Sequence, residues 1–229
     1  MAHPCPPGEK AMPTTVIGIV SSAAAVFINH FKMSKLEYLD LRYNQLDNSI
    51  LSYMDGLSSL KSLYLDYNRL KGLIDLKEYS INLETLYLSG NNISKVVASG
   101  GPTNVSTLYL NDITSYGSSF QTLLQSLGAL PNLKKLDLGN NDLRGRILSD
   151  GFLNLKNLEL LDLSYNTLNS NSIFRTIGTM NSLKTLWLQG CSFNGQLPIS
   201  QGLCDLNHLR ELDISSNKLV DSCLRVWQI

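Results

Sequence analysis

The sequence predicts an α/β solenoid. We expect a curved horseshoe of stacked coils, with a parallel β-sheet on its concave face and short helical or irregular segments on its convex face. A phrase of eleven residues recurs eight times along the 229 residues, and successive copies begin 22 to 28 residues apart. Such periods are typical of repeat proteins, in which neighbouring coils bury one another's apolar side chains. The copies begin at Leu36, Leu60, Leu83, Val105, Leu133, Leu158, Leu183 and Leu209.

Residues 83–93, LETLYLSGNNI, show how one copy is built. The alternating Leu86 and Leu88 predict a short strand with both side chains turned inward, so that Tyr87 between them faces outward. The chain then turns, and the amide of Asn91 can satisfy backbone groups that a buried turn leaves without partners. Equivalent asparagines predict one hydrogen-bonded row along the solenoid. They are Asn44, Asn68, Asn91, Asn141, Asn166 and Asn217.

Two copies depart from this row. Cys191, a weaker donor, occupies the asparagine position of the seventh copy, and Ile113 occupies it in the fourth, where we expect an irregular turn. The shared pattern, L-x-x-L-x-L-x-x-N/C-x-L, resembles the leucine-rich repeat. It divides the chain into a non-repeat segment, 1–32, and a repeat domain of about eight repeats, 33–229. In the longest gap, Leu123, Leu127 and Leu130 predict a helix that packs on the convex side.

The segments that follow the asparagine row carry a more specific resemblance. The runs LKGLI (70–74), LRGRI (143–147) and FNGQLP (193–198) resemble the L-x-G-x-I-P extension of plant-specific leucine-rich repeats. The stretch GLCDLNHLRELDISSNKL (202–219), followed by SCL (222–224), resembles plant receptor-like proteins, which are cell-surface receptors without a kinase of their own. The resemblance implies a secreted ectodomain at the plasma membrane that signals through a co-receptor kinase in defence or development.

The chain also departs from that family. It has Val220 and Asp221 where the family has a proline, and it shows no paired-cysteine N-terminal cap and no membrane span. We therefore expect a fragment or truncated member. Residues 1–32 are interpreted as either a weak signal peptide or a disordered leader. Their apolar part is broken, and the preceding MAHPCPPGEKAMPTT has one lysine and four prolines. Without a signal peptide, the chain would be cytosolic.

Composition and motifs exclude several functions. Nineteen basic residues balance nineteen acidic ones, so no overall field attracts nucleic acid or an anionic membrane. No nucleophile elbow, phosphate-binding glycine loop or metal-spaced cluster is present, so we predict neither an enzyme nor a metal or cofactor site. Asp137 and Asp162 would face each other on adjacent coils about 5 Å apart, which suits a carboxylate pair. The repeated phrase LDL explains their identity better.

The outward strand residues suggest a binding face. Tyrosines occupy this position in three consecutive copies, and aromatic side chains offer large contact areas at low entropic cost. We therefore expect a peptide or protein ligand on the concave face. The alternative is that tyrosine is simply a good strand residue that stacks on its neighbours. The aspartates further along would suit a basic ligand segment. The candidate ligand-binding residues are Tyr43, Tyr64, Tyr67, Tyr87, Tyr109 and Trp187.

Two further features depend on the cellular compartment. The triplets that begin at Asn92 and Asn104 are glycosylation acceptors if the chain is secreted. Cys204 and Cys223 fall in the convex parts of successive coils, and the family places cysteines similarly, so a disulfide is expected in a secreted chain and two buried thiols otherwise. The alternatives to a receptor ectodomain are an intracellular leucine-rich-repeat adaptor and a truncated remnant that does not signal.

Overall fold

The computed structural model describes eight parts of the chain. The segment 1–32 and the predicted disulfide partners Cys204 and Cys223 lie outside these described residues. The described parts are 34–76, 82–100, 103–113, 118–141, 143, 152, 154–196 and 206–220.

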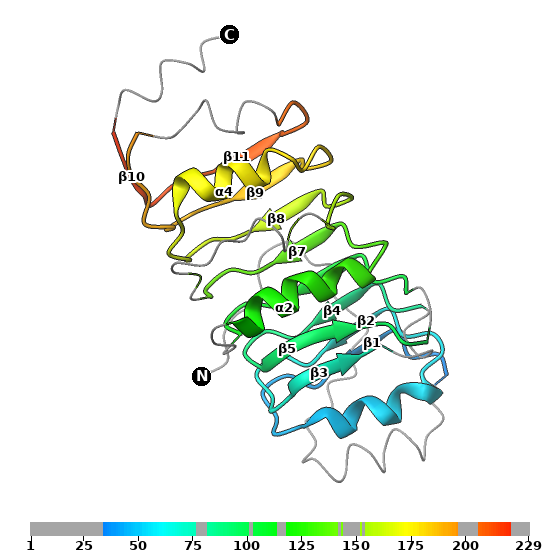
Figure 1. Cartoon of the computed structure of the whole chain (residues 1–229). Helices are drawn as coiled ribbons and strands as arrows, with labels where there is room; N and C mark the ends of the chain where they lie inside the picture. Colours follow the sequence, from blue (N-terminus) through cyan, green and yellow to red (C-terminus); the bar gives the residue numbers. More distant parts are fainter. Residues whose placement is uncertain are drawn as a thin grey trace.

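One parallel sheet of eight strands runs through all eight repeats, which confirms the predicted solenoid. Each coil contributes one strand, and the strands follow one another in chain order (Figure 1). Leu39 pairs with Leu63, and every later strand keeps this register up to the last. The strands are β1 (Tyr38–Asp40), β2 (Ser62–Tyr64), β4 (Thr85–Tyr87), β6 (Thr107–Tyr109), β7 (Lys135–Asp137), β8 (Leu160–Asp162), β9 (Thr185–Trp187) and β11 (Glu211–Asp213).

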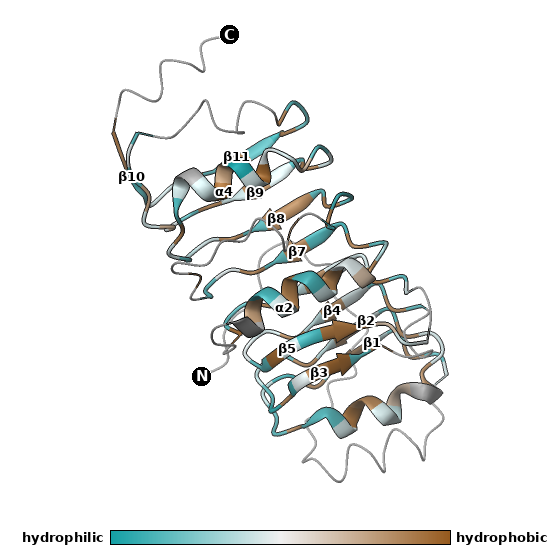
Figure 2. Ribbon diagram, in the orientation of Figure 1, coloured by the Kyte–Doolittle hydropathy of each residue, from teal (hydrophilic) through white to brown (hydrophobic). Residues whose placement is uncertain are grey.

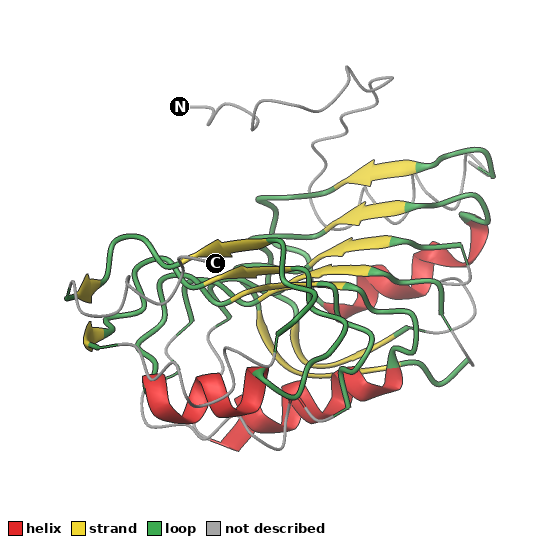
Figure 3. Cartoon of the chain, turned by 90° about the horizontal axis from the view of Figure 1, so that it is seen from above, coloured by secondary structure: helices red, strands yellow, loops and turns green. Residues whose placement is uncertain are grey.

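Short helices lie on the side opposite this sheet (Figure 3). The helix predicted in the longest gap is present as α2 (Ser118–Ser126) followed by the 3₁₀ turn η3 (Leu127–Ala129), and it packs on β5 (Asn92–Val97). Among the described residues, η1 (Asn48–Gly56) and α4 (Ser170–Ile177) are further helical segments.

The structure adds two small parallel sheets that were not predicted. One pairs β3 (Lys71–Asp75) with β5, and the other pairs β10 (Asn194–Gly195) with β12 (Lys218–Leu219). Each small sheet includes one of the glycine-containing runs 70–74 and 193–198, in which Gly72 and Gly195 have φ of +65° and +67°. Glycine adopts this conformation without the strain that a Cβ introduces. At Gly72 it coincides with a shift in the β3–β5 register.

The core is a continuous layer of leucines between the main sheet and the convex segments. Leu86, Leu108 and Leu136 are fully buried, as are Leu123 and Leu127 of the convex helical region. Each coil buries these side chains against its neighbours, because a coil three strand residues wide has too little interior of its own. The core is therefore one cluster along the whole described solenoid.

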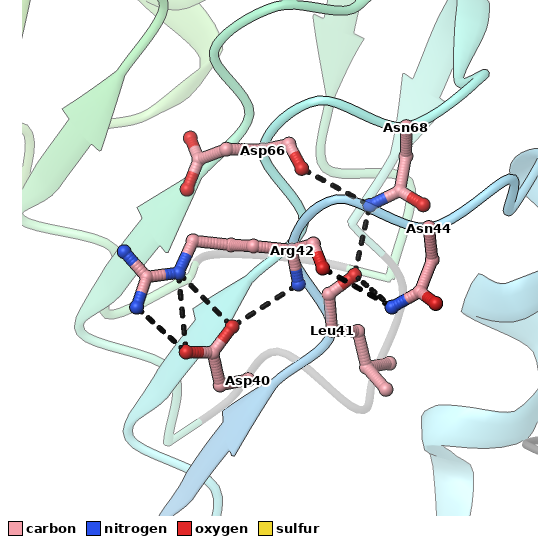
Figure 4. Close-up of polar contacts among 6 residues, drawn as sticks. All are labelled: Asp40, Leu41, Arg42, Asn44, Asp66 and Asn68. Atoms are coloured by element: carbon pink, nitrogen blue, oxygen red, sulfur yellow. Dashed lines mark hydrogen bonds and ion pairs between the residues drawn. The ribbon is translucent and has the colours of Figure 1, made fainter. Parts of the chain in front are cut away.

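The asparagine row forms as the repeat predicts. The Asn91 amide donates to carbonyl oxygens of Leu65 in the preceding coil and of Leu88 and Ser89 in its own, at 2.9–3.2 Å. Its Oδ1 accepts from the Leu70 amide at 3.1 Å. Asn68, Asn141, Asn166 and Asn217 also link two coils, and Figure 4 shows Asn68 bonded to the Leu41 and Asp66 carbonyls. Since every bond satisfies a turn group, the row holds the coils in register.

The two exceptions in this row behave differently. The Cys191 thiol donates to the Leu163 carbonyl at 3.2 Å, so it keeps the link to the preceding coil. Ile113 has no side-chain donor, but its backbone amide donates to Asn141 Oδ1 at 2.8 Å. The residues that follow it, 114–117, lie outside the described residues, so the expected irregular turn remains a prediction there.

A second asparagine row was missed in the sequence. Asn82, Asn132 and Asn157 each precede the first leucine of a copy, and each amide donates to a carbonyl of the preceding coil, at 2.7, 2.8 and 3.3 Å. The recurring Asn-Leu pair was the available signal. These bonds tie together the turns that lead into the strands.

Candidate functional site

The outward strand residues form one column across the sheet, the concave column. Tyr64, Tyr87 and Tyr109 stack within it, with ring centroids 4.1 and 4.3 Å apart and interplanar angles of 13° and 3°. The parallel register places these residues directly opposite one another, so the stacking follows from the backbone. In order, the concave column is Asp40, Tyr64, Tyr87, Tyr109, Asp137, Asp162, Trp187 and Asp213.

The first face of the tyrosine stack is covered by a cation. The Arg42 guanidinium lies 5.1 Å from the Tyr64 ring centroid. Asp40 holds it there through contacts of 2.7–3.1 Å, which Figure 4 shows. These bonds raise the pKa of Arg42 further above its ordinary value. The arginine is therefore fixed over the ring as a cation–π contact.

The three stacked tyrosines are unequally exposed. Tyr64 is only 7% exposed, whereas Tyr87 and Tyr109 are half-buried. Burial, together with the neighbouring hydroxyls, raises the pKa of the Tyr87 phenol well above its ordinary value. The stack thus presents ring edges and neutral hydroxyls, with most of the accessible surface on Tyr87 and Tyr109.

Two other candidate tyrosines lie in the turn after the strand. Tyr43 and Tyr67 stack with centroids 4.8 Å apart and remain 69% and 42% exposed. Every coil has a left-handed residue at this turn position, here called the turn column, with φ between 52° and 66°. The Tyr67 ring covers the next member, and Tyr165 covers another in the same way. The turn column is Tyr43, Tyr67, Gly90, Asp112, Asn140, Tyr165, Gly190 and Ser216.

The aspartates of the concave column have a structural task. Oδ1 of Asp137, Asp162 and Asp213 accepts the backbone amide two residues later, at 2.9, 2.7 and 2.8 Å. Such a bond caps the start of the turn. The repeat therefore explains these carboxylates without a catalytic pair.

In the coils of Tyr87 and Tyr109, where tyrosine replaces aspartate, the cap comes from the preceding coil. Asp66 Oδ1 accepts the Ser89 amide at 2.8 Å, and Ser89 Oγ accepts the Asn111 amide at 3.2 Å. The Asn111 side chain in turn donates to Asp137 at 3.0 Å. We call Asp66, Ser89, Asn111 and Asp137 the cap relay. No pattern within a single copy indicates the cap relay, because its members lie in different coils.

Two carboxyls of the cap relay are poorly hydrated. Burial raises the pKa of Asp66 to about 6, and backbone and hydroxyl donors at Ser89 oppose the rise. Burial also raises the pKa of Asp137 to about 6, and the charge of Asp162 adds to the effect. Both groups remain hydrogen-bonded, which is the usual condition for a buried carboxyl.

Trp187 lies in a separate hollow on the later coils, here called the acidic hollow. It has a volume of about 450 Å³ and is also lined by Tyr165, Asp162, Glu211 and Asp213. Trp187 Nε1 donates to Glu211 Oε1 at 2.9 Å, which fixes the indole. In Figure 2, β7 and β11 are coloured largely as hydrophilic, which fits the charged residues at both ends of each strand.

Both glycosylation candidates are accessible. The side chains of Asn92, at the start of β5, and of Asn104, before β6, are exposed. Modification needs such exposure.

Comparison with known proteins identifies the repeats. The chain matches family models described as leucine rich repeat, which together cover more than half of it. The chain belongs to the leucine-rich-repeat family. The matched residues are 24–70, 82–103, 132–155, 182–204 and 205–222.

The resemblance to plant receptor-like proteins is confirmed by two relatives from Arabidopsis thaliana. Receptor-like protein 9a is 44% identical over 62 residues, which are 26% of this chain and 7% of the relative. Receptor-like protein 1 is 34% identical over 70 residues, which are 30% of this chain and 6% of the relative. The matched part thus spans less than a tenth of either relative.

Solved structures show the same leucine-rich-repeat architecture. Internalin C2 from Listeria monocytogenes has a TM-score of 0.64 at 21% identity, covering 88% of this chain and 86% of that one. Human 5T4 has a TM-score of 0.65 at 26% identity, covering 80% and 70%. Among the helices of the described residues, none has the length and apolar character needed to cross a bilayer.

Proposed function

We propose that this leucine-rich-repeat chain binds a peptide or protein ligand on its concave face, as part of a plant receptor-like protein in defence or developmental signalling. The observation that carries the proposal is the concave column itself, which pairs an aromatic stack with a fixed tryptophan among carboxylates. Stacked coils offer an extended surface, and rigid aromatic side chains are frequent anchors at interfaces. A binding role of this kind calls for no catalytic group.

The two ends of the concave face favour different ligand groups. Tyr87 and Tyr109 offer ring edges and hydroxyls to an apolar or amide-rich segment. The acidic hollow has Asp162, Glu211 and Asp213 and no basic side chain in its lining, so it suits a lysine or arginine of the ligand beside Trp187. The exposed Tyr43 and Tyr67 extend the first end.

A displayed library of random peptides, selected on the chain, would test this assignment. We expect Trp187→Ala to weaken selected peptides roughly tenfold or more, as truncation of an aromatic anchor usually does. Tyr87→Ala would weaken those that contact the tyrosine stack. Leu73→Ala is the matched control, because Leu73 is a 50% exposed apolar residue on β3, outside the main sheet. Selected peptides that lose affinity only with Leu73→Ala would contradict the proposal.

Receptor function also requires entry into the secretory path. Expression in plant cells, with and without glycosidase, would show a gel shift that Asn92→Gln and Asn104→Gln together abolish. In that compartment, Cys204 and Cys223 would form the disulfide, and a co-receptor kinase would be the signalling partner. A cytosolic chain without the shift would instead support the intracellular adaptor.

A further inference from the structure

A second hollow lies at the edge where the strands begin, here called the basic hollow. It has a volume of about 630 Å³ and is open to solvent. Three of its lining residues, Lys134, Lys184 and Arg210, directly precede β7, β9 and β11. None of its lining residues is shared with the acidic hollow.

The charges of the basic hollow are not balanced. Lys184 and Lys134 approach the same carboxylate, Glu159, at 2.6 and 3.5 Å. Arg210 is exposed, and its side chain has no hydrogen bond or ion pair among the described residues. His208 also lines the hollow. Three permanent cations and only one anion therefore line this solvent-accessible surface.

The basic hollow is located where the second asparagine row ends. Asn157 still bridges to the preceding coil, through Pro131 O at 3.3 Å. The next two coils have Ser182 and His208 at this position, and in the described structure neither side chain makes the corresponding bridge. Ser182 and His208 thus line the hollow without tying their coils to the preceding ones.

From this arrangement we infer that the basic hollow binds an acidic segment of a protein partner. Its cations are distributed over coils five to eight, and neighbouring strands lie about 4.8 Å apart, so they span roughly 14 Å. One small anion cannot contact a site of this length, whereas an extended peptide with several carboxylates can. The amides of Asn181 and Asn207, which also line the hollow, can bond the backbone of such a peptide.

A peptide suits the basic hollow better than a nucleic acid. Glu159 lies between the two lysines. A nucleic acid backbone carries a phosphate at every nucleotide and would bring charge against this carboxylate, whereas a peptide can place an uncharged residue there. The chain as a whole has no net charge, so it lacks the long-range field typical of nucleic-acid binding.

The test uses a fluorescent peptide of alternating glycine and glutamate, with matched glycine–glutamine and glycine–lysine peptides, in a polarisation titration of the full chain. We expect only the glutamate peptide to bind, with an affinity that falls as salt rises. Arg210→Gln should weaken binding roughly two- to fivefold, the range for one exposed ion pair. Arg210→Glu should weaken it further.

Lys218→Gln is the matched control, because it removes the same charge from an exposed residue of the same coil, after β11 and outside the basic hollow. Thermal unfolding would confirm that the variants are folded, as expected when Arg210 has no side-chain partner. The inference would be overturned if the glutamate peptide did not bind, or if Arg210→Gln and Lys218→Gln lost equal affinity. It would also be overturned if a single-stranded oligonucleotide of equal charge bound more tightly than the peptide. Since these residues do not line the acidic hollow, the outcome is independent of the peptide selection on the concave face.

Discussion

Coils three and four and coils five, six and eight cap the turn after the strand in different ways. In the later coils, Asp137, Asp162 and Asp213 cap the turn of their own coil. In coils three and four, tyrosine occupies that position and the cap comes from Asp66 or Ser89 of the preceding coil. In the first arrangement, the residue of the concave column is needed to cap the turn. In the second, that position does not cap the turn and can hold a tyrosine.

This difference explains how Tyr87 and Tyr109 are tolerated in coils three and four. An uncapped amide buried at the turn costs free energy, so a coil cannot simply exchange its aspartate for an aromatic residue. The cap relay supplies the missing acceptor from a neighbouring coil, and Asp66 is only 6% exposed as a result. A binding surface in a repeat protein can thus depend on residues that are hidden beneath it.

The largest expected effect on stability concerns the turn column, which has a left-handed residue in every coil of both regions. A Cβ at Gly90 would overlap the Tyr67 ring, and one at Gly190 would lie 2.8 Å from Cδ1 of Tyr165. Gly90→Ala should lower the free energy of unfolding by roughly 3 kcal/mol, from overlap and left-handed strain together, and Gly190→Ala by somewhat less. Urea denaturation would measure both.

Gly72→Ala is the control for the turn column. Gly72 has φ of +65° and no atom within 4 Å of an added Cβ, so only the strain, about 1 kcal/mol, remains. Adding Tyr67→Ala to Gly90→Ala should recover the part of the stability loss that comes from steric overlap with the Tyr67 ring. Equal losses at Gly72 and Gly90 would show that the tyrosine ring plays no part.

The next effect separates the two capping arrangements. Asp66→Ala leaves the buried Ser89 amide without its acceptor and should cost about 2 kcal/mol. Asp66→Asn keeps an acceptor and removes a poorly hydrated charge, so it should match or exceed the wild-type stability at neutral pH. Asp213→Ala, in the later region, removes a more exposed cap and should cost less than Asp66→Ala. The reverse order would contradict the cap relay.

The pH dependence of stability should reflect the titration of the buried carboxyls of the cap relay. The pKa of Asp66 and of Asp137 is about 6 in the folded chain, against an ordinary value of 3.8. The folded state therefore binds more protons than the unfolded state between these values, and the free energy of unfolding should rise as pH falls through this window. The rise should be on the order of 1 to 2 kcal/mol. Thermal unfolding between neutral pH and about pH 5 would measure it.

Asp66→Asn combined with Asp137→Asn should flatten that dependence. The surface carboxyl Asp213 has a lowered pKa, so its stabilising contribution is lost only below this window. Stability that falls steadily from neutral pH would be inconsistent with buried, poorly hydrated carboxyls in the cap relay.

The smallest effects should come from the surface ion pairs, which occur in both regions. Lys61 pairs with Glu37 at 3.1 Å in the early coils, and Lys184 pairs with Glu159 at 2.6 Å in the later ones. Exposed pairs of this kind are screened by water and salt. Lys61→Gln and Lys184→Gln should therefore leave the urea midpoint unchanged. A clear loss in one region alone would mean that charge pairs, and not caps, distinguish the two regions.

The repeat pattern was sufficient to predict the sheet, its register and the first asparagine row. The residues equivalent to Leu86 and Leu88 point inward in every coil, because each coil packs against nearly the same neighbours. The tyrosine stack was predicted as one of two interpretations, and the structure adds that Tyr64 is nearly buried beneath Arg42. The small sheets of β3 and β10 were not predicted, since two short runs become strands only when adjacent coils place them side by side.

By itself, the sequence determined which residues repeat, and repetition determined the solenoid, the leucine core and the order of the concave column. Tertiary structure decided which of those residues are accessible and which act across coils. The cap relay, the rings over Gly90 and Gly190, and the two hollows all join residues more than twenty positions apart. The physical reason is that a coil's own pattern specifies its backbone, whereas the partners of its side chains are supplied by the coils on either side.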